Sequence, residues 1–200
     1  MELKEVIETR RSIRKFKTDP VPEAYIDELL EAARLAPSGG NIQPWRFAVI
    51  KSPEARAQLS DLTLEFVARA PVVIACCTDM SALKAQAARY KELRESGAFE
   101  GVTMNLSRAL PKSSQEMGEE QIRGYLHQNT AIAVEHIILR AVDLGLGCCW
   151  VMMFDRAELA ARLELPENIR PFCLVPIGYP DQKPQPRPRK DIAELIIKKI

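Results

Sequence analysis

The chain has 200 residues, of which 46% are hydrophobic and 28% are charged, a balance typical of a folded globular protein and too apolar for a disordered one. Its 28 Lys and Arg residues nearly cancel 27 Asp and Glu residues, leaving a net charge of +1. That balance argues against a globally basic nucleic-acid binder. No apolar run is long enough to span a membrane, and the first residues lack the apolar core of an export signal. We therefore expect one cytoplasmic domain over residues 1–200.

Cysteine and histidine spacing argues against metal and nucleophile chemistry. The five cysteines are Cys76, Cys77, Cys148, Cys149 and Cys173. They lack the C-x-x-C spacing of zinc or redox sites and lie in apolar segments, so we interpret them as reduced, buried thiols. His127 and His136 are too far out of phase to share a helix face. With no G-x-S-x-G or Walker motif either, we assign no catalytic or metal-binding side chain and expect a bound cofactor to carry any enzymatic chemistry.

The first half of the chain alternates helical and extended patterns. Apolar spacing predicts an amphipathic helix over 3–10 and a second over 22–35, which begins at Pro22 and ends before a Pro-Ser-Gly-Gly turn. Aromatic and β-branched content predicts a strand over 45–51. The next segment, 53–66, is interpreted as a helix. The continuous apolar run over 71–77 predicts a strand that is covered on both faces.

The second half is dominated by one long helix. A charged helix is predicted over 82–95, and the longest helical pattern covers 119–144, with an apolar stripe wide enough for a largely buried helix. We then expect a strand over 148–154, a helix over 155–163 with Asp155 as its N-cap, and a strand over 172–177.

Two segments do not fit regular structure. Residues 96–118 are the least regular stretch, as expected of a lid or a mobile binding segment. Beyond Pro180, closely spaced prolines force an extended arm, which leads to an apolar tail over the last ten residues. Such a tail needs a surface to pack on, and a partner subunit is a reasonable candidate.

A basic cluster near the N-terminus is the first candidate site. Five of the eight residues from 10 to 17 are cationic, and they include Arg10, Arg11 and Arg14, with the Ser12 hydroxyl between them. Guanidinium groups and a hydroxyl suit phosphate oxygens. The alternative is a solvated helix end.

A second cluster, Arg187 and Arg189 with Lys190, lies on the proline-rich arm. Alone it is consistent with a solvated surface. If the two clusters met in space, their repulsion would favour a bound anion between them.

A third candidate is the turn after the second helix. Its glycines allow a flat ligand to approach the backbone, and Ser38, Asn41 and Gln43 offer polar contacts. A helix cap followed by a turn explains the glycines equally well, but it does not require the Asn and Gln side chains.

These motifs together resemble the nitroreductase family of FMN-dependent NAD(P)H oxidoreductases. The motifs are RRSIRKF at 10–16, APSGGNIQPWRF at 36–47, GLGCCWVMMFD at 145–155 and IGYP…KPQPRPRK at 177–190. The resemblance implies an α+β fold with a central mixed β-sheet flanked by helices. It also implies an intertwined homodimer whose C-terminal arm, from about residue 180, extends onto the partner subunit.

The resemblance further implies which positions contact FMN. Arg10, Ser12, Arg187 and Arg189 match the positions that hold the phosphate and ribityl end. Arg14 matches the cation beside N1 and O2 of the flavin, where positive charge stabilises the reduced ring. Pro37, Ser38, Gly39 and Asn41 match a loop that reaches FMN from the other subunit. Trp150, Val151, Met152 and Met153 match the segment lying against the flavin, with backbone NH groups near N5. With their neighbours Arg11 and Gln43, these residues form the expected cofactor site.

The implied reaction passes a hydride from NAD(P)H to the flavin and then to a nitroaromatic, a quinone or a similar acceptor. Two departures from the family pattern matter. Met152 and Met153 stand where many members have Gly or a polar residue, and Leu62 and Glu65 fall near the place of an Asn and a Lys that hold the pyrimidine edge in some members.

Two alternatives remain open at this point. One is specialised flavin chemistry, such as reductive dehalogenation or flavin breakdown, with a preference set by residues 96–118. Tyr90, Phe99, Met104 and Tyr125 are candidate pocket residues for it. The other is a non-catalytic module that binds phosphate or nucleic acid.

Overall fold

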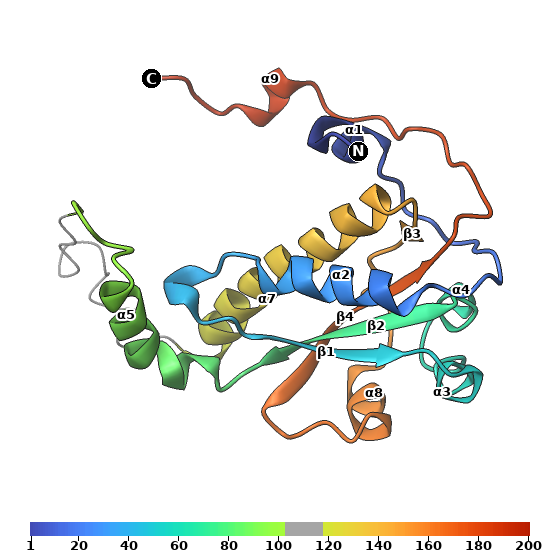
Figure 1. Cartoon of the computed structure of the whole chain (residues 1–200), viewed down its shortest axis with the longest axis horizontal. Coiled ribbons are helices and arrows are strands. Elements are labelled where there is room, and N and C mark those ends of the chain that lie inside the picture. The colour runs from blue at the N-terminus through green and yellow to red at the C-terminus, as the bar shows by residue number, and fades with distance from the viewer. Residues whose placement is uncertain (103–117) are drawn as a thin grey trace.

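The centre of the molecule is a sheet of four strands in the order β1-β2-β4-β3, seen in a computed structural model that describes residues 1–102 and 118–200 (Figure 1). The strands are β1 (Trp45–Ile50), β2 (Val72–Asp79), β3 (Gly147–Cys148) and β4 (Ile169–Gly178). Every neighbouring pair is antiparallel. The expected mixed sheet is therefore wrong for the strands of this chain. Parallel pairing within the described residues is confined to an isolated bridge between Ser12 and Cys148, because β4 returns between β2 and β3 and runs opposite to both.

The two faces of the sheet carry separate apolar cores. Alternate residues of β2 divide between them: Ile74 packs with one core and Val73 with the other. The first core is covered by α2 (Glu23–Arg34) and α7 (Glu119–Asp143), and the second by α3 (Pro53–Ala57), α4 (Glu65–Ala68) and α8 (Arg156–Arg162). This explains why the strand segment from residue 71 is apolar throughout instead of alternating.

The remaining elements lie at the periphery. Helix α1 (Leu3–Thr9) precedes the basic cluster, and the one-turn helix η1 (Gly39–Asn41) sits in the turn after α2. The turn η2 (Ala82–Ala85) leads into α5 (Gln86–Glu95), which projects from the body of the molecule (Figure 1). The C-terminal arm carries the short α9 (Ile192–Leu195) and runs along the outside of the molecule, past α1 (Figure 1).

Most of the expected elements are confirmed, but two predicted elements are less regular in the structure. Residues 53–66 form two short helices instead of one, because the chain turns between them to bury Leu59 and Leu62 and to bring Thr63 into a bridge with Phe154. The strand expected over 148–154 is regular only at β3. Beyond it the chain makes single bridges at Val151 and Phe154, since it bends away from β4 to reach Thr63.

Of the irregular stretch 96–118, residues 103–117, including Met104, lie outside the described residues. In the part of the chain that the structure describes, no helix combines the length and the apolarity needed to cross a bilayer.

Candidate functional site

The basic cluster after α1 runs directly beside β3. The backbone NH of Ile13 donates to the Cys148 carbonyl at 2.9 Å, next to the Ser12–Cys148 bridge. The approach is tight, because a Cβ atom added to Gly147 would stand 2.7 Å from the Ile13 side chain. Glycine at this position therefore lets the two segments lie side by side, which places the basic cluster at the edge of the sheet.

A pocket of about 280 Å³ opens where this segment meets the sheet edge. Arg10, Ser12, Glu135, Ile138, Cys148, Cys149 and Trp150 line it. The structure thus brings together three residues expected at the phosphate and flavin ends of the cofactor site: Arg10, Ser12 and Trp150. Arg10 forms no ion pair within residues 1–102 and 118–200. Its guanidinium is therefore available to an anionic ligand.

Glu135 is the acidic member of the pocket. Partial desolvation of its carboxyl raises the pKa of Glu135, and the nearby charges of Arg10 and His136 oppose that rise. Burial disfavours the thiolate form of the two cysteines in the pocket. Burial raises the pKa of Cys148 to about 12. It also raises the pKa of Cys149, against the opposing effect of the Arg14 charge.

The segment after Trp150 leaves the sheet and exposes two methionines. The Val151 backbone is paired with Leu174, whereas Met152 and Met153 bulge outward, with 44% and 68% of their surface exposed. Both carbonyls are held, that of Met153 by the Thr63 hydroxyl at 2.7 Å and that of Met152 by Arg156 at 3.3 Å. Neither NH donates a hydrogen bond to another described residue. Within the described residues, these two NH groups are therefore left without an acceptor.

The turn of residues 37–43 is a separate, tightly bonded structure. Gly40, Asn41 and Gln43 adopt positive φ angles of 59°, 55° and 46°. Such angles cost energy in residues other than glycine. Hydrogen bonds hold the turn in this shape: the Ser38 hydroxyl accepts from the Gln43 NH at 3.0 Å, and the Gln43 amide donates to Asn41 at 2.8 Å.

Two tyrosines lie against the glycines of this turn. A Cβ atom on Gly39 would collide with the Tyr125 hydroxyl, and one on Gly40 would stand 3.5 Å from the Tyr90 ring. Pro37, Ser38, Gly39, Asn41 and Gln43 are absent from the lining of the Arg10 pocket in the same chain.

The other expected cations do not line this pocket in the single chain. Arg11 donates to the carbonyls of Glu8 and Arg10, each at 2.8 Å, and so caps the end of α1. Arg14 is exposed, as are Arg187 and Arg189 on the extended arm. Arg189 donates only to carbonyls of the arm itself among the described residues. Arg187 and Arg189 do not line the Arg10 pocket in this chain.

The sequence motifs and this geometry agree with a family comparison. A model of the nitroreductase family matches residues 7–179. The chain belongs to the nitroreductase family. An NADH dehydrogenase of Thermus thermophilus is 30% identical over 94% of this chain and 91% of its own. A 5,6-dimethylbenzimidazole synthase of Rhodobacter capsulatus is 32% identical over 90% of this chain and 84% of its own.

Solved structures show the same nitroreductase fold. A nitroreductase family protein of Streptococcus pneumoniae is 28% identical and superimposes with a TM-score of 0.80, covering 99% of this chain and 100% of its own. A protein of Exiguobacterium sibiricum, solved in complex with FMN, is 23% identical, with a TM-score of 0.81 over 100% of this chain and 98% of its own. The α+β fold expected from the nitroreductase motifs is therefore confirmed.

Sequence reasoning missed three side chains that shape this nitroreductase site. Glu135 lines the Arg10 pocket, Asn129 holds the 37–43 turn, and Asp79 receives Arg46 beside that turn. Two of them carried a usable signal. Asn129 interrupts the apolar stripe of the long helix, and Asp79 is a charged residue two positions after the apolar run over 71–77.

Proposed function

We propose that this chain is an FMN-dependent NAD(P)H oxidoreductase that reduces nitroaromatic, quinone or similar acceptors. The observation that carries the proposal is the Arg10 pocket, where an arginine that forms no ion pair with the described residues meets Ser12 and Trp150 at the sheet edge of a nitroreductase-family chain. The FMN bound to the Exiguobacterium sibiricum protein of the same fold supports this choice of cofactor. When bound, FMN accepts a hydride from NAD(P)H and delivers it to the acceptor.

The residues present fit such a ligand. Arg10 and Ser12 would bind the phosphate and the ribityl hydroxyls, since a guanidinium and a hydroxyl are matched donors for those oxygens. Arg14, exposed beside the pocket, would supply positive charge to the pyrimidine edge of the flavin. The NH groups of Met152 and Met153, which have no acceptor among the described residues, would donate to the flavin ring. Their side chains would restrict the space left for an acceptor.

The same proposal includes an intertwined homodimer. The tail exposes its apolar side chains, namely Ile192, Leu195, Ile197 and Ile200. Exposed apolar surface of this kind favours burial against another chain. The 37–43 turn does not line the Arg10 pocket of its own chain, which supports its contacting FMN across the dimer. Arg187 and Arg189 would then approach a phosphate from the exchanged arm.

Flavin titration of the purified protein tests the cofactor. We expect a yellow protein that binds FMN in a stoichiometric ratio and is bleached by NAD(P)H in the absence of oxygen. Arg10→Gln should weaken FMN binding far more than riboflavin binding, because riboflavin lacks the phosphate. Lys4→Gln, on the exposed face of α1, is the matched control. A colourless protein that cannot be reconstituted with FMN would overturn the proposal.

Acceptor assays test the reaction class. NAD(P)H consumption with a nitroaromatic or a quinone, with FMN recovered intact, is the expected result. Recovery of the flavin is a necessary part of this measurement, because flavin breakdown is one of the alternatives that the sequence leaves open. Loss of FMN in step with NAD(P)H would instead indicate flavin breakdown.

A further inference from the structure

A buried carboxylate marks the end of β2. Asp79 is 8% exposed and accepts hydrogen bonds from the Ser81 NH at 2.9 Å, the Ser81 hydroxyl at 2.6 Å and the Asn168 amide at 2.8 Å. Burial alone would raise the pKa of Asp79, but these hydrogen bonds and the Arg46 charge lower it below the ordinary value. The hydrogen bonds and the Arg46 charge therefore favour the ionised form of this side chain.

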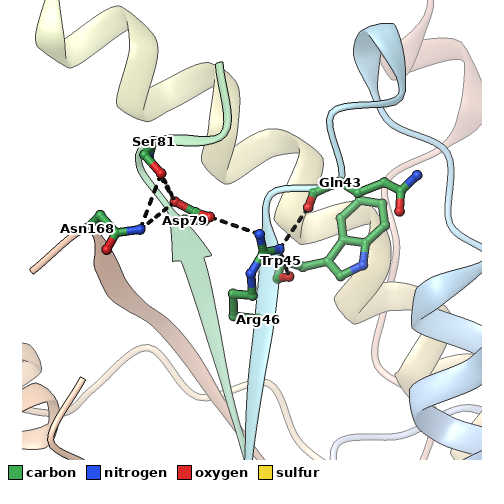
Figure 2. A network of polar contacts seen from close by, with 6 residues as sticks. All are labelled: Gln43, Trp45, Arg46, Asp79, Ser81 and Asn168. Carbon is green, nitrogen blue, oxygen red and sulfur yellow. Dashed lines mark hydrogen bonds and ion pairs between the residues drawn. The ribbon is translucent and has the colours of Figure 1, made fainter. Parts of the chain in front are cut away.

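Arg46 connects this carboxylate to the 37–43 turn (Figure 2). One terminal nitrogen donates to Asp79 at 2.9 Å, and the other donates to the carbonyls of Gln43 at 3.0 Å and Trp45 at 2.7 Å. The Asp79 NH also donates to the Pro44 carbonyl at 2.7 Å. The end of the turn is thus bonded to the end of β2 through both side chain and backbone.

The turn needs such support because its backbone is strained. Asn41 and Gln43 both hold left-handed φ angles that side-chain-bearing residues rarely adopt. Strained conformations of this kind persist only where the surroundings fix them, and they gather at ligand sites. Arg46 bonds directly to the carbonyl of one of these two strained residues, Gln43.

We propose that Arg46 and Asp79 are positioning residues of the cofactor site: the Arg46 bridge between the Asp79 carboxylate and the Gln43 carbonyl holds the 37–43 turn in the conformation that contacts FMN of the partner subunit. This inference rests on the proposed function. Arg46 does not touch the cofactor, and its effect passes through the turn.

Arg46 is suitable for a test because it can be changed without opening the core. Its side chain is about half exposed, at 51%, whereas that of Asp79 is 11% exposed. Arg46→Gln keeps a polar side chain but removes the charge and the fork that reaches three acceptors at once. The matched control is Arg34→Gln, which breaks the exposed Arg34–Glu31 ion pair on α2.

The first measurement is the FMN dissociation constant of each dimer, together with its melting temperature without FMN. Arg46→Gln should weaken FMN binding about tenfold at a melting temperature close to that of Arg34→Gln. Arg46→Lys should fall between the two, because an ammonium can pair with Asp79 but cannot bridge both carbonyls in the same geometry. Wild-type FMN affinity in Arg46→Gln would overturn the inference. Failure of the wild-type protein to bind FMN would instead overturn the proposed function.

A mixed dimer separates positioning from general damage. One protomer carries Arg10→Gln and the other Arg46→Gln, with different tags for purification. If the turn acts across the dimer, the mixed dimer contains one intact site, made of the Arg10 pocket of one protomer and the turn of the other. It should bind one FMN per dimer with wild-type affinity, while both parent homodimers bind weakly. Two weakened sites in the mixed dimer would overturn the inference.

Discussion

The Asn129 side chain accepts a hydrogen bond from the Gly39 NH at 2.8 Å and donates one to the Tyr125 carbonyl at 2.7 Å. It therefore ties the 37–43 turn to the middle of α7, while Arg46 ties the other end of the turn to β2. Asn129 is 5% exposed and lies on the apolar side of the helix. Both hydrogen bonds form in an environment where an unmade bond is costly.

Removing the Asn129 amide should loosen the turn. Asn129→Ala leaves the Gly39 NH without its partner, and we expect it to lower the free energy of unfolding by about 1–3 kcal/mol. Chemical denaturation of the cofactor-free protein measures this change. Gln128→Ala, at the exposed neighbouring position on α7, should be nearly neutral. Equal stability of the two variants would show that the Asn129 contacts do not hold the turn.

The long helix α7 could be predicted from the sequence, whereas the role of Asn129 within it could not. Apolar spacing correctly predicted α7, and the continuous apolar run correctly predicted β2 as a strand buried on both faces. Periodicity treats a polar residue in an apolar stripe as noise, so the roles of Asn129 and Asp79 needed the tertiary contacts. The bend after β3 was missed for a similar reason, because only the fold shows that Phe154 must reach Thr63.

The direction of strand pairing and the assembly of the site from distant residues could not be predicted from local sequence patterns. The mixed sheet was inferred from family resemblance, and strand pairing within one chain cannot be deduced from periodicity. The structure brings Arg10, Ser12 and Trp150 together in one pocket, and their binding of FMN stays a prediction. The placement of Arg187 and Arg189 depends on the path of an extended arm, which carries few contacts of its own.

The cysteines should be unreactive in the folded protein. All five are free and buried, and burial raises the pKa of Cys77 and of Cys148 to about 12. Because the thiolate is the reactive form, iodoacetamide at pH 8 should leave the native protein unmodified and label all five residues after denaturation. Intact-mass spectrometry measures both states, with glutathione in the same solution as a reactivity control. Rapid labelling of a native thiol would contradict this assignment of buried cysteines.

The apolar tail should be needed for the dimer. Deleting residues 191–200 removes Ile192, Leu195, Ile197 and Ile200, which are exposed in the single chain. We expect sedimentation velocity to show a shift from dimer toward monomer. Changing Lys198 and Lys199 to Ser keeps the apolar side chains and should leave the dimer intact. A truncated protein that sediments like the full chain would show that the tail does not contribute to assembly.

The charge of Glu135 should oppose the cofactor phosphate. The pKa of Glu135 is raised, so this side chain loses its proton over a higher pH range than an ordinary glutamate. Below that pKa the side chain is neutral, and above it a negative charge faces the phosphate that Arg10 binds. Phosphate binding should raise the pKa of Glu135 further, because like charges disfavour ionisation. FMN affinity should therefore fall as pH rises through this range, and FMN binding should take up a proton.

Glu135→Gln tests this coupling by removing the titrating group. At neutral pH the variant should bind FMN about threefold more tightly than the wild-type protein. The difference in FMN affinity between the two proteins should disappear as pH falls, since the Glu135 side chain of the wild-type protein then becomes neutral too. The FMN phosphate also titrates, near pH 6. This affects binding to both proteins equally, so the ratio of the wild-type and Glu135→Gln affinities for FMN reports on Glu135 alone. Riboflavin should bind both proteins equally, and Glu120→Gln, exposed on the first turn of α7, should behave as wild type. Weaker FMN binding by Glu135→Gln at every pH would show instead that the carboxylate orients Arg10 toward the phosphate.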